Sequence, residues 1–88
     1  MVKSVHTNEY NALRTLLIAE RNAARLTQQA LADKLGRPQS YVSKFELGER
    51  RLDVVEFLEI IHAIGVDPCS VLKKIEGDRR TDKTERRR

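Results

Sequence analysis

A glycine between two short apolar patterns, Gly36, constrains this chain more than any other single residue. Before it, Leu31 and Leu35 recur at helical spacing, and after it Val42 and Phe45 do the same. Glycine tolerates the positive φ that a tight connection between two helices requires. The pattern therefore predicts two short helices joined by a turn of three or four residues, which is the helix-turn-helix shape.

Start and stop signals set the bounds of this pair. Thr27 is a good N-cap for a helix over residues 28–35. Pro38 suits the first turn of the next helix, because the N–H that proline lacks would be unpaired there anyway. Gly48 then predicts the end of that helix, so the helix-turn-helix spans residues 28–47.

Similar signals predict three further helices and no strand. Asn8 is a plausible N-cap for the first helix, and Asp53 with Glu56 has the capping-box pattern at the start of the fourth. Asp67 followed by Pro68 repeats the signal for a start. The sequence thus predicts an all-α domain of five helices over residues 8–25, 28–35, 38–47, 54–64 and 68–76.

The two ends of the chain differ from this domain, which is expected over residues 8–77. Residues 1–7 are expected to form a loose leader. Residues 78–88 contain no apolar residue and six Lys or Arg, so they cannot contribute to a core. We expect a disordered basic C-terminal tail, and Gly77 is expected to end the fifth helix.

Charge is unevenly distributed along the chain, whose formal net charge is +4. Residues 21–52 hold seven Lys or Arg against three acids, whereas residues 53–77 hold two against five. A basic helix-turn-helix next to an acidic segment indicates a polyanionic partner on one side of the molecule.

Several classes of protein are excluded or not expected. Cys69 is the single cysteine, so no intramolecular disulfide can form, and with His6 and His62 it leaves too few ligands for a typical zinc site. Cys69 is expected to be a buried or half-buried small hydrophobe. No apolar run approaches a membrane span, and no signal peptide is visible, so a cytoplasmic location is expected. No catalytic constellation is present, and we expect neither an enzyme nor a cofactor, metal or small-molecule ligand.

The residues from 26 to 50 read LTQQALADKLGRPQSYVSKFELGER. This string strongly resembles the phage-repressor/Cro-like helix-turn-helix family, also called the XRE family, and the resemblance extends over residues 13–71. The family consists of small five-helix domains that usually dimerise and bind operator DNA as transcriptional regulators. The resemblance therefore implies a sequence-specific regulator, with double-stranded DNA as the partner.

The resemblance also implies roles for individual positions. The third helix lies in the major groove in this family, and the base-contacting positions correspond to Gln39, Ser40, Ser43 and Lys44. The phosphate-contacting positions correspond to Gln28, Arg50 and Arg51. Tyr41 is a further candidate for a phosphate contact, and its alternative place is the buried face of the third helix. Arg21 and Glu46 match a pair that the family often fills with a structural ion pair. Pro38 departs from the Ser or Thr that caps the recognition helix in many members, so this helix must begin differently.

The fourth helix is apolar over more of its surface than one core contact requires. Either the fifth helix or a second subunit covers the surplus. We favour a twofold homodimer, which also places two recognition helices on one face of DNA. The expected interface residues are Val66, Val71, Leu72 and Ile75.

A second class of function uses the same fold. An antitoxin or anti-factor module would bind another protein as its main ligand. The polar, basic pattern of residues 39–44 favours DNA over this alternative.

Overall fold

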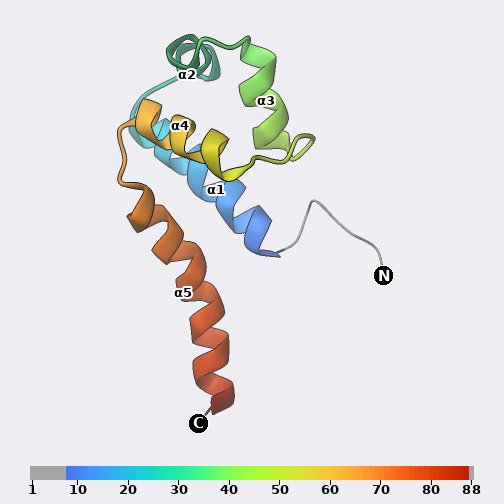
Figure 1. The fold of residues 1–88 in the computed structure, drawn as a ribbon, viewed down its shortest axis with the longest axis vertical. Helices are drawn as coiled ribbons and strands as arrows, with labels where there is room; N and C mark the ends of the chain where they lie inside the picture. The colour runs from blue at the N-terminus through green and yellow to red at the C-terminus, as the bar shows by residue number, and fades with distance from the viewer. Residues whose placement is uncertain (1–7, 88) are drawn as a thin grey trace.

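The computed structural model describes residues 8–87, with side chains described for residues 8–77. The predicted leader, residues 1–7, and Arg88 lie outside the described residues. The described chain forms five helices and no strand, which confirms the predicted fold class. In chain order they are α1 (Asn8–Ala23), α2 (Gln28–Leu35), α3 (Gln39–Leu47), α4 (Val54–Ile64) and α5 (Pro68–Arg87). In Figure 1, α2 and α3 lie at one end of the molecule, α1 and α4 in the middle, and α5 leads away from the other end.

Local capping explains where α2 begins and ends. The Thr27 hydroxyl accepts a hydrogen bond from the Ala30 N–H, which satisfies one of the free donors of the first turn. Gly36 adopts φ 68°, a left-handed conformation that costs a residue with a Cβ about 1–2 kcal/mol. The short turn after Gly36 brings the chain directly into α3.

The start of α3 and the start of α4 are built differently. Pro38 precedes α3 with no side-chain hydrogen bond to the helix, as its lack of a donor or acceptor group requires. At α4 the capping box is complete, because the Glu56 N–H donates to Asp53 Oδ1 at 2.7 Å and the Asp53 N–H donates to Glu56 Oε1 at 3.0 Å.

Two helix ends differ from the prediction. The first helix ends at Ala23 rather than Arg25, which takes a positive φ of 62°. The last helix passes Gly77 and continues to Arg87. A single glycine inside a helix costs about 1 kcal/mol relative to alanine, which neighbouring turns can offset. The predicted disorder of residues 78–88 stays a prediction.

All five helices contribute side chains to one core. Leu17 of α1, Leu31 of α2, Phe45 of α3 and Ile61 of α4 are fully buried there. Val71 of α5 is also fully buried. The fifth helix therefore covers part of the apolar surface of α4 within one protomer, and Val71 is not available to a second subunit, contrary to its expected place in the interface.

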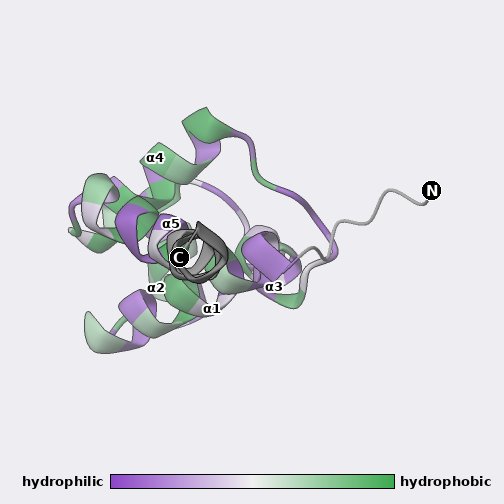
Figure 2. Cartoon of the chain, turned by 90° about the horizontal axis from the view of Figure 1, so that it is seen from below, coloured by the Kyte–Doolittle hydropathy of each residue, from purple (hydrophilic) through white to green (hydrophobic). Residues whose placement is uncertain are grey.

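Some apolar surface remains uncovered on the protomer. Val54 and Val55 in the first turn of α4 are 72% and 64% exposed, and this turn is visible as a hydrophobic segment in Figure 2. Leu47 at the end of α3 and Leu72 on α5 are exposed as well. Cys69, at the start of α5, is exposed, whereas a buried or half-buried position was expected.

Candidate nucleic-acid interface

One face of α3 is exposed and polar. Gln39, Ser40 and Lys44 are exposed, and Ser43 is half-buried between them. The opposite face is buried by Val42 and Phe45. The four residues predicted to contact bases thus share the outer side of a helix whose inner side is anchored in the core.

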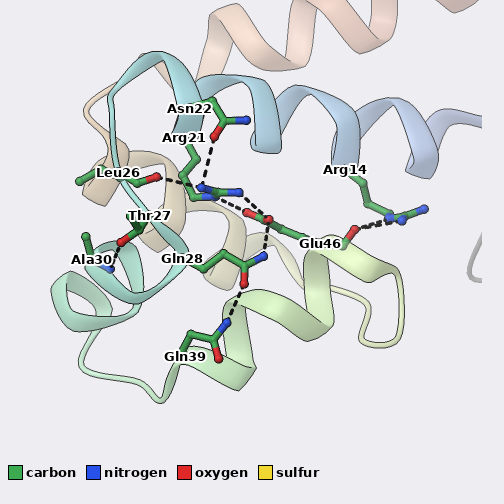
Figure 3. A network of polar contacts seen from close by, with 9 residues as sticks. All are labelled: Arg14, Arg21, Asn22, Leu26, Thr27, Gln28, Ala30, Gln39 and Glu46. Atoms are coloured by element: carbon green, nitrogen blue, oxygen red, sulfur yellow. Dashed lines mark hydrogen bonds and ion pairs between the residues drawn. The ribbon is translucent and has the colours of Figure 1, made fainter.

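The predicted pair of Arg21 and Glu46 forms a buried link between α1 and α3. The Arg21 Nε donates to Glu46 Oε2 at 2.7 Å and Nη2 donates to Glu46 Oε1 at 3.0 Å (Figure 3). The Arg21 side chain is 12% exposed and the Glu46 side chain 5%. The guanidinium also donates through Nη1 to the Leu26 carbonyl oxygen at 2.8 Å. Charge-assisted, two-pronged pairing of this kind fixes direction as well as distance.

The buried pair continues outward as a chain of hydrogen bonds. Gln28 Nε2 donates to Glu46 Oε1 at 2.9 Å, and Gln39 Nε2 donates to Gln28 Oε1 at 2.6 Å. Figure 3 shows these residues in line from the interior to the exposed start of α3. Gln28, predicted as a phosphate contact, is therefore also the residue through which Gln39 is joined to the ion pair.

A second arginine of α1, which was not predicted as a site residue, contacts the same residue of α3 as Arg21 does. Arg14 Nε and Nη2 donate to the main-chain carbonyl oxygen of Glu46 at 3.2 and 2.9 Å. A cation at the C-terminal end of a helix complements the partial negative charge of its free carbonyl groups. Arg14 precedes Arg21 by seven residues, and that spacing, which places both on one face of α1, is the signal that could have found it.

The loop after α3 is organised by Tyr10. Its hydroxyl donates to the Arg50 carbonyl oxygen at 3.2 Å and accepts from the Leu52 N–H at 3.2 Å. The guanidinium of Arg51 lies over the Tyr10 ring, 4.4 Å from its centroid. The loop that carries two predicted phosphate contacts is thus held from α1.

Arg50 is directed toward α4 instead of outward. Its Nη2 donates to Glu56 Oε2 at 2.6 Å and Nη1 donates to Glu56 Oε1 at 3.1 Å. The hydrogen bond from Arg50, followed by that from the Asp53 N–H, lowers the pKa of Glu56 to about 2. The same hydrogen bond raises the pKa of Arg50. In the free protein this arginine is engaged by a carboxylate, so a phosphate would have to compete for it.

The aromatic ring of Tyr41 contacts two arginine side chains, Arg37 and Arg50. The guanidinium of Arg37 lies 4.4 Å and that of Arg50 4.9 Å from the centroid of its ring. Its hydroxyl is buried and has no hydrogen-bond partner among the side chains described for residues 8–77. Burial, followed by the nearby charge of Glu56, raises the pKa of Tyr41. A hydroxyl in this position is not presented to a phosphate, in contrast to the role expected for Tyr41.

Residues 8–77 contain no group of three or more histidine, cysteine, aspartate or glutamate side chains that could hold a metal ion. Among the described helices, none has the length and hydropathy needed to cross a membrane.

Comparison with known proteins agrees with this geometry. Residues 17–71, more than half of the chain, match the model of a helix-turn-helix family. An XRE-family like protein from Pseudomonas syringae pv. tomato is 54% identical, with a TM-score of 0.76 over 78% of this chain and 84% of that chain. The chain belongs to the XRE-type helix-turn-helix family. As an XRE-type helix-turn-helix protein, it is a DNA-binding transcription regulator.

A second solved structure shares the fold of this XRE-type protein at lower identity. The clp gene regulator ClgR from C. glutamicum is 23% identical, with a TM-score of 0.72 over 83% of this chain and 95% of that chain. Among curated proteins, no match to the chain is found.

Proposed function

We propose that this protein is a homodimeric regulator that binds a palindromic operator with α3 in the major groove. The observation that carries the proposal is the exposed polar face of α3, on a helix that Arg14 and Arg21 of α1 hold at Glu46, near its C-terminal end. A recognition helix needs exposed side chains that can contact bases and a backbone that the rest of the fold holds in place.

The proposed base contacts follow the chemistry of each side chain. Gln39 can bond adenine through two hydrogen bonds, Lys44 can reach the O6 and N7 atoms of guanine, and Ser40 and Ser43 can donate or accept. Gln28, at the start of α2, is proposed to contact a phosphate with help from the helix N-terminus. Arg51 is a further proposed phosphate contact, and Arg50 is proposed to contact a phosphate after release from Glu56.

The proposed dimer uses the exposed part of α5. Leu72 is exposed, and Val66 and Ile75 are half-buried and pack against the core of their own protomer. A twofold axis at this surface would present two copies of α3 to half-sites about 34 Å apart. Leu72→Lys should convert the dimer to a monomer in sedimentation experiments, whereas Lys73→Ala on the same helix should leave it dimeric.

The test of operator binding is selection from randomised double-stranded DNA, sequenced at two salt concentrations. We expect an enriched inverted repeat with half-sites about one helical turn apart. Gln39→Ala and Lys44→Ala should each relax a different position of the repeat. Lys73→Ala is the matched control for Lys44→Ala, because it removes one exposed positive charge from α5 and should relax no position.

A second candidate function rests on the exposed valines of α4. Val54 and Val55, with Leu47 nearby in sequence, offer apolar surface to a protein partner, as an antitoxin or anti-factor requires. In that case the selection would enrich no motif, and weak binding would vanish at the higher salt concentration.

A further inference from the structure

Glu46 differs from every other member of the polar chain in Figure 3 because its side chain only accepts hydrogen bonds. Arg21 donates to both of its oxygens, and the remaining donor at Glu46 Oε1 is Gln28 Nε2. The Gln28 amide therefore has one allowed orientation, with its nitrogen toward the carboxylate and its oxygen toward α3.

The orientation of Gln28 in turn dictates that of Gln39. Gln28 Oε1 faces Gln39 at 2.6 Å, so the Gln39 amide must turn its nitrogen inward. Reversing the Gln39 amide would bring two carbonyl oxygens together at this distance, and reversing Gln28 would place its oxygen against the Glu46 carboxylate at 2.9 Å. Each reversal replaces a hydrogen bond with a repulsive contact.

The groups that Gln39 has left then define what it can recognise. Its Oε1 and its second N–H are not used in the chain of hydrogen bonds. The Gln39 amide therefore offers a base one acceptor beside one donor. Adenine offers the complementary pair, the N6 donor and the N7 acceptor, whereas guanine offers two acceptors, O6 and N7. An amide with one N–H already used cannot donate two hydrogen bonds to guanine.

We propose that Glu46 is a specificity-determining positioning residue, whose buried carboxylate sets the donor–acceptor direction of the Gln39 amide through Gln28 and so selects adenine over guanine. The inference rests on the proposed function, in which Gln39 contacts a base. It assigns Glu46 a part in base selection that is separate from the stabilisation expected of its pairing with Arg21.

The direct test is Glu46→Gln, with competition binding to operators that carry adenine or guanine at the position read by Gln39. The new amide carries one oxygen, so either of its orientations loses one hydrogen bond from Arg21. The two possible donor–acceptor directions of the hydrogen bonds through Gln28 to Gln39 then become comparable in free energy. We expect the preference for adenine over guanine to fall by about tenfold, within the range of one bidentate base contact.

Arg21→Lys is the matched control, because it weakens the same ion pair but leaves the carboxylate as an obligate acceptor. It should lower stability and overall affinity while retaining the preference for adenine. A purely structural role for Glu46 predicts the same behaviour from both variants, so the difference between them is the readout. Circular dichroism at the binding temperature verifies that each variant is folded.

Gln28→Ala provides a second test that keeps the ion pair and decides the matter if Glu46→Gln does not fold. Without Gln28 the Gln39 amide is free to rotate, and both of its N–H groups become available, so the preference for adenine should fall by a similar factor. Glu46→Gln added to Gln28→Ala should cause no further loss of preference, because the chain is already interrupted.

The variants separate failure of this inference from failure of the proposed function. In one outcome, Gln39→Ala removes the preference for adenine at one operator position while Gln28→Ala and folded Glu46→Gln both retain it. That result refutes the role of Glu46 and leaves the contact between Gln39 and DNA standing. If Gln39→Ala relaxes no base pair, the proposed base contact fails and this inference fails with it.

Discussion

Replacing Arg21 with methionine should destabilise the protein more than any exposed substitution. The change removes the guanidinium from a site where its side chain is 12% exposed and leaves the 5% exposed carboxylate of Glu46 with Gln28 as its remaining donor. It also removes the hydrogen bond to the Leu26 carbonyl oxygen at 2.8 Å. The free energy lost comes mainly from an uncompensated buried charge, not from the attraction itself.

The expected size of this loss is large for such a short chain. Breaking a buried ion pair by removing one partner costs about 3–5 kcal/mol. A chain of 88 residues has a free energy of unfolding of about 4–13 kcal/mol at the usual values per residue. At about 4–8 °C per kcal/mol, the lower limit of 3 kcal/mol lowers Tm by at least about 12 °C.

Urea denaturation and thermal melting followed by circular dichroism measure both quantities. Arg25→Met, an exposed arginine four residues further on, is the matched control and should change stability by about 0.5 kcal/mol or less. Arg21→Met combined with Glu46→Leu should recover most of the loss, because it removes the stranded charge. A loss below about 1 kcal/mol for Arg21→Met, the value of an exposed pair, would refute the reasoning from burial.

Four other substitutions test three separate parts of the structure. Gly36→Ala should lower the free energy of unfolding by about 1–2 kcal/mol because φ is 68° there. Gly77→Ala, inside α5, should instead raise it by up to about 1 kcal/mol. Equal effects of the two substitutions in urea denaturation would contradict the assigned backbone conformations. The pKa of Glu56, lowered from 4.5 to about 2 mainly by Arg50, contributes stability that is fully present above about pH 4.5 and is lost as the pH falls toward 2. Glu56→Gln should flatten this part of the curve of stability against pH, and an unchanged acid slope would show that other carboxylates cause it. Tyr41→Phe removes a buried hydroxyl without a partner and should be neutral or stabilising by up to about 1–3 kcal/mol, with unchanged DNA affinity; a fall in affinity would return the hydroxyl to the phosphate contacts.

The start of each capped helix and the turn of the helix-turn-helix could be predicted because their causes are local. Thr27 caps α2 through a residue three positions away, and Asp53 and Glu56 cap α4 in the same way. Such signals act within one turn, so composition elsewhere in the chain does not alter them. The far end of α5 was not predicted, because a glycine inside a helix and a glycine that ends one look alike in sequence.

The site was only partly accessible from the sequence. The positions on the outer face of α3 and the pair of Arg21 with Glu46 came from resemblance, and the structure brings that pair together at 2.7 Å. Glu46 lies in phase with Val42 and Phe45, and an acidic residue on an otherwise apolar face is a sign of a buried partner. Nothing local indicated that Gln28 would bridge Glu46 and Gln39.

The sequence by itself determined five helices, their caps, the turn at Gly36 and which face of α3 is polar, since each depends on residues within about one helical turn of one another. The tertiary structure alone decided that Arg50 pairs with Glu56, that the Tyr41 hydroxyl is buried and that Val71 belongs to the core of its own protomer. The contacts of Arg14 and Tyr10 join residues 32 and 40 positions apart. Such contacts depend on how whole helices pack, and packing is a property of all their buried side chains together.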